Sequence, residues 1–194
     1  MAKQYIYIPV NSDEMNDFAT KIASAMNIPK NQILANKVTS GCGKAMYRWI
    51  DKCLSKLAAN DTLYIVAHGA GEADSQKIGA QRNQSGNKQK LVYERGLPSW
   101  QGGVMKTYTP EHLSGTLNKE GLPSTFVNLH MFACGSGLAG TLPAWAKRLK
   151  DAMVQTHPSI QVTGYTGDIS VGPSDVTIQS GASFYPLQQR AVTF

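Results

Sequence analysis

Cysteine is scarce in this chain, which has only three among its 194 residues: Cys42, Cys53 and Cys134. Such few and scattered cysteines exclude the disulfide framework of small secreted domains and the paired ligand spacing of a zinc site. We therefore expect a reducing compartment in which Cys134 remains a free thiol, and chemistry that requires no metal. Apolar runs are also short: none approaches the roughly 18 residues that span a bilayer, so we expect no membrane span.

Charged residues make up only 16% of the chain and hydrophobic residues 42%, a composition typical of a globular protein. The length suits a single domain over residues 1–194. The N-terminal strand pattern is too brief for a signal-peptide core, so we expect a cytoplasmic protein or an effector exported by a dedicated secretion machine. The net charge of +6 comes without a nucleic-acid recognition motif, so we expect no nucleic-acid partner.

The order of the predicted elements indicates an α/β fold. Apolar runs predict strands over 5–10, 63–68, 126–134 and 160–165. Helical spacing and capping residues predict helices from Asn11 to Ile28, with Glu14 as capping-box partner of Asn11, and over 44–58, 109–117 and 141–155. Short β-like pieces follow in the tail, 170–194. Strands that alternate with helices predict a three-layer α/β/α sandwich with a mostly parallel central sheet.

The segment 71–107 differs from the rest of the chain. Gln, Asn, Lys, Gly and Ser dominate it, and apolar residues occur only in short groups. So long a polar stretch inside a compact domain is usually functional or disordered. We predict a hairpin with a mobile loop that overhangs the end of the strand carrying His68.

Two of the predicted strands end in reactive side chains. One apolar run ends at His68-Gly69 and another at Cys134-Gly135. Because the carboxyl ends of parallel strands share one edge of a sheet, we expect the imidazole and the thiol to meet there. A thiol beside a base is the minimum equipment of a nucleophilic cysteine enzyme.

The residues around these strand ends suit acyl transfer. Glycine after each reactive side chain lets a substrate backbone approach closely, so we assign Gly135 and Ser136 to substrate binding. The amide N–H groups of Gly69 and Cys134 are candidates for an oxyanion hole, which stabilises the tetrahedral intermediate.

The two strand ends resemble those of clan CD cysteine peptidases, the caspase-like group. The resemblance is carried by apolar residues before His68-Gly69 and by Phe132-Ala133-Cys134-Gly135, covers roughly residues 5–168, and is nearest to the autoprocessing domains of bacterial toxins and effectors. It implies that Cys134 attacks a protein or peptide substrate, or the chain itself, to give a thioester, while His68 protonates the leaving amine. It also implies an acidic specificity residue, for which Asp168 is the candidate; a turn-capping role is the alternative.

The toxin relatives in this group are activated by an inositol polyphosphate. The resemblance therefore implies a possible activator site in the basic loop, although a simply solvated loop accounts for the same charges. The residues concerned are Lys77, Arg82, Lys88, Lys90, Arg95 and Lys106.

Other reactive residues have simpler interpretations. Cys53 lies on the apolar stripe of a predicted helix and is assigned to the core, and Cys42 lies in a glycine-rich turn that departs from the P-loop pattern. His130 lies within its strand, and His112 and His157 are interpreted as surface or helix-terminal residues. Two further functions stay open: a thiol-dependent acyl or group transferase on the same fold, and a non-catalytic protein-binding module.

Overall fold

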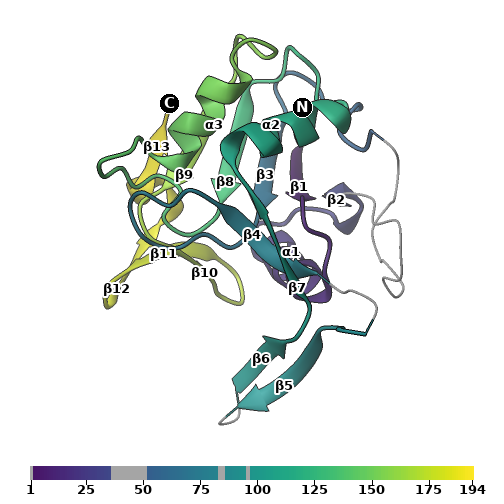
Figure 1. The fold of residues 1–194 in the computed structure, drawn as a ribbon, viewed down its shortest axis with the longest axis vertical. Coiled ribbons are helices and arrows are strands. Elements are labelled where there is room, and N and C mark those ends of the chain that lie inside the picture. Colours follow the sequence, from purple (N-terminus) through teal and green to yellow (C-terminus); the bar gives the residue numbers. More distant parts are fainter. Residues whose placement is uncertain (1, 36–51, 83–85, 95–96) are drawn as a thin grey trace.

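A computed structural model describes residues 2–35, 52–82, 86–94 and 97–194 of the chain (Figure 1). Its centre is a six-stranded sheet in the order β13-β9-β8-β3-β1-β2. The strands are β1 (Gln4–Ile8), β2 (Ile33–Ala35), β3 (Thr62–Val66), β8 (Asn128–Phe132), β9 (Gln161–Tyr165) and β13 (Ala191–Thr193). All neighbours are parallel except β13, which pairs antiparallel with β9. The prediction of a mostly parallel central sheet is confirmed.

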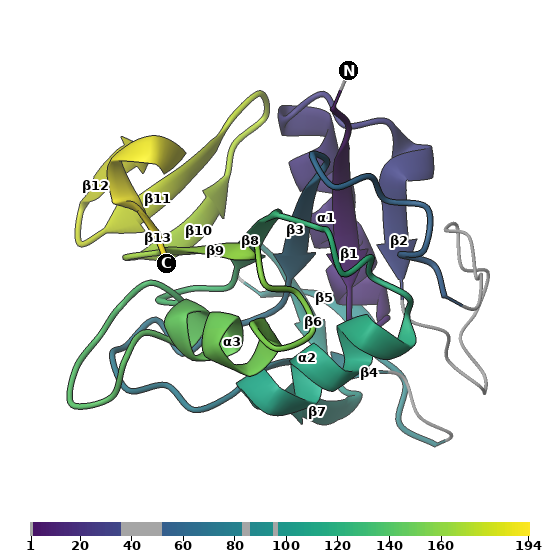
Figure 2. The same ribbon diagram turned by 90° about the horizontal axis from the view of Figure 1, so that it is seen from above.

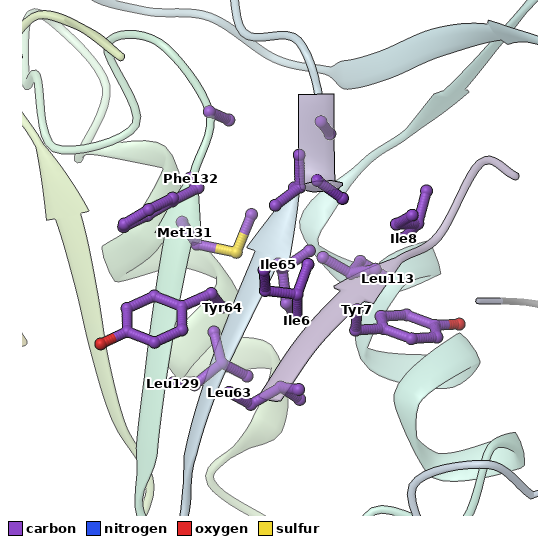
Figure 3. Close-up of a cluster of buried hydrophobic side chains, with 14 of the residues drawn as sticks. Ile6, Tyr7, Ile8, Leu63, Tyr64, Ile65, Leu113, Leu129, Met131 and Phe132 are labelled. Carbon is purple, nitrogen blue, oxygen red and sulfur yellow. The ribbon is translucent and has the colours of Figure 1, made fainter. Parts of the chain in front are cut away.

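The central strands are built from large apolar side chains because both of their faces are covered. Ile6 of β1, Ile65 of β3 and Leu129 of β8 are completely buried, and their neighbours on the same strands form one continuous core (Figure 3). Leu113, from a helix, packs into this cluster. The core thus fixes the register of β1, β3 and β8, and with it the positions at which these strands end.

Three α-helices are present among the described residues: α1 (Asp13–Ala25), α2 (Pro110–Lys119) and α3 (Trp145–Met153). Ser12, and not the predicted Asn11, caps α1, because the Ser12 hydroxyl accepts from the amide of Met15 at 3.3 Å. Thr109 caps α2 in the expected way, with Pro110 in the first turn.

The direction of the crossovers places the helices on both faces of the sheet. From β1 the chain moves through α1 to β2, whereas from β3 it moves the other way through α2 to β8 and through α3 to β9. Because such crossovers are right-handed, α1 lies on the face opposite to α2 and α3. Figure 2 shows α2 and α3 side by side, with the small sheet of β10 (Asp168–Val171), β11 (Val176–Ser180) and β12 (Ser183–Pro186) on the other side of the molecule. The arrangement is compatible with an α/β sandwich.

The polar segment between β3 and α2 forms two antiparallel ladders. β4 (Ile78–Arg82) pairs with β7 (Val104–Tyr108), and within the intervening stretch β5 (Lys90–Glu94) pairs with β6 (Leu97–Gln101). The β5–β6 hairpin extends away from the central sheet (Figure 1). We refer to residues 78–108 as the insertion.

Two predicted helices differ from the structure. Residues 44–51 of the one predicted over 44–58 lie outside the described residues, and its described part, 52–58, forms turns over 52–56 and no helix, although Cys53 is buried as expected. The helix predicted from Thr141 begins only at Trp145, because the backbone amides of Thr141 and Leu142 donate to the carboxylate of Asp74 in a separate loop. No helix in the described part of the chain has the length and apolarity needed to cross a bilayer.

Candidate active site

The carboxyl ends of three neighbouring strands carry the candidate residues. Glu14 lies in the first turn of α1, which follows β1, while His68 and Cys134 follow β3 and β8. The chain changes direction across the sheet between β1 and β3, the kind of switch point at which open α/β sheets bind ligands. The last rung of the β3–β8 ladder joins Val66 and Phe132, so His68 and Cys134 stand two residues beyond the same rung.

His68 is held by its backbone and by its ring. Its N–H donates to the carbonyl of Gly79 at 2.7 Å and its carbonyl accepts from the Gly79 amide at 3.0 Å, which joins the end of β3 to β4. Its Nε2 lies 3.0 Å from Oε1 of Glu14, and the imidazole is 49% exposed. Because an ionised carboxylate only accepts, Nε2 carries the hydrogen and Nδ1 is the nitrogen available for proton exchange in the neutral ring.

Glu14 is a candidate site residue that the sequence interpretation assigned only to a capping box. Its carboxylate does not return to Asn11 as in a capping box; Oε1 faces His68 and Oε2 accepts from the side-chain amide of Gln89 at 3.2 Å. A hydrogen-bonded carboxylate beside a histidine is the usual means of fixing the tautomer and the ring orientation. The signal in the sequence is the position of Glu14 in the first turn of the helix after β1, at the same sheet edge as His68, but this position fits a capping box equally well.

Cys134 contacts the start of β10, where Asp168 and the backbone of Ile169 lie beside its sulfur. Partial burial is the main cause that raises the pKa of its thiol, and the neighbouring Asp168 carboxylate, which accepts a hydrogen bond from the thiol, raises it further. The backbone N–H of Ile169 donates to the sulfur and opposes this shift. The resting side chain is therefore a neutral thiol.

The loops after β3 and β8 touch each other through glycines. The amide of Gly71 donates to the carbonyl of Cys134 at 3.3 Å. A Cβ atom at position 69 would collide with the Cys134 carbonyl oxygen and lie 2.9 Å from its amide nitrogen, and one at position 135 would lie 2.9 Å from the carbonyl carbon of Gly71. Gly135 also has a φ of +67°, which glycine adopts without strain. The absence of side chains therefore allows the two strand ends to approach each other.

Asp168 connects the third loop to this pair. It is the first residue of β10, and besides facing Cys134 it lies so close to Gly71 that a Cβ atom there would stand 2.9 Å from its Oδ1. The candidate specificity residue thus contacts the candidate nucleophile itself.

Ser136 lies below the site surface. The side chain is only 2% exposed; its hydroxyl donates to the carbonyl of Met131 at 2.9 Å and accepts from the amide of Tyr165 at 3.2 Å. The first bond ties the turn to β8 and the second ties it to β9, so both bonds of the hydroxyl are used within the fold. The neighbouring Gly135 amide donates to the carbonyl of Gly167 at 2.9 Å and ties the same turn to the β9–β10 loop.

The two amides assigned to an oxyanion hole are free of backbone partners. Among the described residues, neither Gly69 nor Cys134 donates its N–H to another backbone group. Both amides lie where the loops after β3 and β8 are in contact. Both amides stay candidates for the oxyanion hole, and the Cys134 amide also interacts with its own sulfur, which lowers the pKa of the thiol.

A pocket of about 170 Å³ adjoins His68 on the side of α1. Apolar side chains of α1 and the ring of Trp100, from β6 of the insertion, supply most of its wall, and its rim carries Asp17 paired with Lys21 at 2.9 Å. The lining residues are Glu14, Met15, Asp17, Phe18, Lys21, His68 and Trp100. The insertion thus covers the His68 end of the sheet and forms part of a cavity beside it.

The remaining histidines have structural partners. His130 contacts the hydroxyl of Tyr165 at 2.8 Å, and burial lowers its pKa to about 4, so it is neutral. His157 follows α3 as expected but is only 1% exposed, with Nε2 3.2 Å from the carbonyl of Leu122; the surface interpretation is wrong for this residue. The backbone N–H of His112 donates to the Thr109 hydroxyl.

Cys53, the other cysteine that the structure describes, is buried in the core. Burial and the neighbouring Glu120 raise the pKa of the Cys53 thiol, and Cys42 lies outside the described residues.

The basic residues of the predicted activator loop are distributed over the insertion and the loop before it. Arg82 ends β4, Lys90 begins β5, and Lys106 of β7 lies over the ring of Tyr108 at 5.0 Å. Lys77 and Lys88 are exposed in loops, and Arg95 lies outside the described residues. Within the described ranges, no group of three His, Cys, Asp or Glu side chains has the arrangement of a metal site.

Comparison with known proteins gives no relative: no family model matches the chain, and no curated protein does. The functional argument therefore depends on the residues and their geometry.

Proposed function

We propose that this chain is a cysteine endopeptidase of the caspase-like type, with Cys134 as nucleophile and His68 as general acid–base. One observation carries the proposal: His68 and Cys134 end adjacent parallel strands whose following loops are in direct contact, and the His68 ring is held by a carboxylate. A nucleophile, a base and a group that orients the base are the three parts of an activated nucleophile.

The reaction would proceed through a thioester. The Cys134 thiol transfers its proton to Nδ1 of His68 as the sulfur attacks the scissile carbonyl carbon, and the oxyanion binds the amides of Gly69 and Cys134. His68 then returns the proton to the leaving amine as the C–N bond breaks. Water, deprotonated by His68, attacks the thioester, releases the acid product and restores the thiol.

The environment of Cys134 supports activation by the substrate. The raised pKa keeps the resting thiol protonated, in contact with the Asp168 carboxylate. A peptide that enters the site displaces this contact and brings a carbonyl to the sulfur, so the thiol is deprotonated at the moment of attack. Such an enzyme is protected from oxidation at rest, because the thiolate is the reactive form.

The biological role follows from the resemblance of the strand ends to toxin and effector peptidases. The proposed substrate is a protein or the chain itself, within a host or donor cytoplasm. Transfer of the acyl group to an amine instead of water would use the same intermediate; mass spectrometry of treated proteins separates the two, because hydrolysis gives fragments and transfer adds mass.

A peptide-based thiol-reactive probe tests the proposal directly. We expect wild-type protein and the Cys53→Ala variant to be labelled and to cleave a peptide library, and Cys134→Ala to do neither. His68→Ala should retain slow alkylation but lose cleavage by about 10²–10⁴-fold, the contribution of general acid–base catalysis. Equal labelling of Cys134→Ala and wild type would contradict the assignment of the nucleophile.

A further inference from the structure

The side chain of Gln89, in the insertion, contacts Glu14, the carboxylate beside the candidate base. Gln89 lies directly before β5 and is only 7% exposed, unusual for a glutamine. Its side-chain nitrogen donates to Oε2 of Glu14 at 3.2 Å, and its side-chain oxygen accepts from the backbone N–H of Glu14 at 3.4 Å. Gln89 is 75 positions from Glu14 in the sequence and bonds to both the side chain and the backbone of Glu14. These two hydrogen bonds fix the Glu14 side chain relative to the Glu14 backbone.

The two oxygens of Glu14 have different partners. Oε1 faces Nε2 of His68 at 3.0 Å, and Oε2 faces Gln89 at 3.2 Å. A carboxylate held at one oxygen presents the other in a fixed direction, so the orientation of the imidazole depends on a residue of the insertion. The other charged groups on the pocket wall around Glu14 are Asp17 and Lys21, which pair with each other at 2.9 Å.

We infer that Gln89 is a positioning residue for the peptidase reaction: it acts through Glu14 to hold the Nε2–H tautomer and the orientation of His68. The inference rests on the proposed function. It also gives the insertion a role, because removal or displacement of the segment around residue 89 would release Glu14 while leaving the central sheet intact.

Asn87 provides a matched control within the same segment. Its side-chain nitrogen donates to the carbonyl of Gly103, and its side-chain oxygen accepts from the Gly103 amide, each at 2.9 Å. Like Gln89, it has a side-chain amide that makes two hydrogen bonds to a single residue, but it is exposed, and both of its bonds go to backbone within the insertion. Asn87→Ala therefore removes a doubly bonded amide from the same segment without removing a contact to Glu14.

The experiment compares ¹⁵N NMR spectra of the His68 ring and peptidase kinetics, with folding verified by circular dichroism. We expect Gln89→Ala to show mixed tautomers of His68 and a kcat about tenfold lower with nearly unchanged KM, since a mispositioned base loses part of a 10²–10⁴-fold contribution. Asn87→Ala should match wild type in both. If Gln89→Ala also matches wild type in tautomer and kcat, the inference is overturned.

A second variant, Gln89→Glu, keeps the size of the side chain and adds a titratable group. When protonated, the new carboxyl can donate to Oε2 of Glu14; when ionised, it repels the Glu14 carboxylate. We expect its activity relative to wild type to fall as pH rises from about 4 to 7, the range in which carboxyl groups ionise. A pH-independent ratio would contradict the inference. The NMR readout needs no substrate. If wild-type protein shows no peptidase activity while Gln89→Ala still changes the His68 tautomer, the proposed function is refuted and the contact of Gln89 with Glu14 still positions His68.

Discussion

Asp168 is the residue whose charge most directly affects Cys134. Burial is the main cause of the raised pKa of the thiol, and the Asp168 carboxylate adds to it by its charge and by accepting a hydrogen bond from the thiol. Both Asp168 contributions favour the protonated form and are lost when the carboxylate becomes an amide. The pKa of Cys134 should then fall, while the effect of burial remains.

Asp168→Asn should therefore make Cys134 react faster with iodoacetamide at neutral pH. Each unit by which the pKa falls gives about tenfold more thiolate at neutral pH. Each thiolate is then roughly threefold less nucleophilic, so the net alkylation rate should rise about threefold for each unit. The pH dependence of alkylation, with the midpoint shifted to lower pH, measures the change. Asp175 is an exposed carboxylate in the turn that joins β10 to β11, and Asp175→Asn should leave the profile as in wild type. A shift of Asp168→Asn to higher pH would contradict the argument.

At the scale of elements, the contact between the ends of β3 and β8 depends on Gly69. A Cβ atom at this position would collide with the backbone of Cys134, which cannot rotate away as a flexible side chain could. The two loops would have to separate, and with them His68 and Cys134.

Gly69→Ala should destabilise the protein by about 1–3 kcal/mol, the usual cost of overpacking, and abolish cleavage. Gly115→Ala is the matched control: this glycine lies inside α2 with no atom within 4 Å of the added Cβ, so the same change should stabilise by about 0.5–1 kcal/mol. Urea unfolding of both variants gives the two free energies. Stability of Gly69→Ala equal to that of wild type would show that the strand ends can separate without cost.

The parts of the site that could be predicted from the sequence are those set by apolar runs. His68 and Cys134 end such runs, and parallel pairing brings their ends together. Glu14 could not be assigned in this way, because its spacing from Asn11 fits a capping box equally well, and only the tertiary fold shows that His68 and Gln89 bind it instead. Strand β5 has no buried residue and hence lacks the alternation of buried and exposed positions that identifies a strand.

At the scale of the whole molecule, stability should be uneven. The central strands β1, β3 and β8 are buried and pair on both sides, whereas β5 and β6 pair chiefly with each other and expose Leu91 and Tyr93. A two-stranded hairpin without a covered face is marginally stable. Gln89, immediately before this hairpin, is nevertheless buried against α1.

Native-state hydrogen exchange should therefore divide the insertion. We expect the amides of β5 and β6 to exchange through local opening, at a small fraction of the unfolding free energy. The amides of the β4–β7 ladder should be more protected, and those of β3 and β8 should exchange only through global unfolding. Because Gln89 belongs to the docked part, Gln89→Ala should lower the protection of β4 and β7 more than Asn87→Ala does, without changing β3 and β8. If amides of the hairpin and of the core showed equal protection from exchange, the insertion and the central sheet would unfold as one unit. Local opening of the hairpin could then not alter the position of His68.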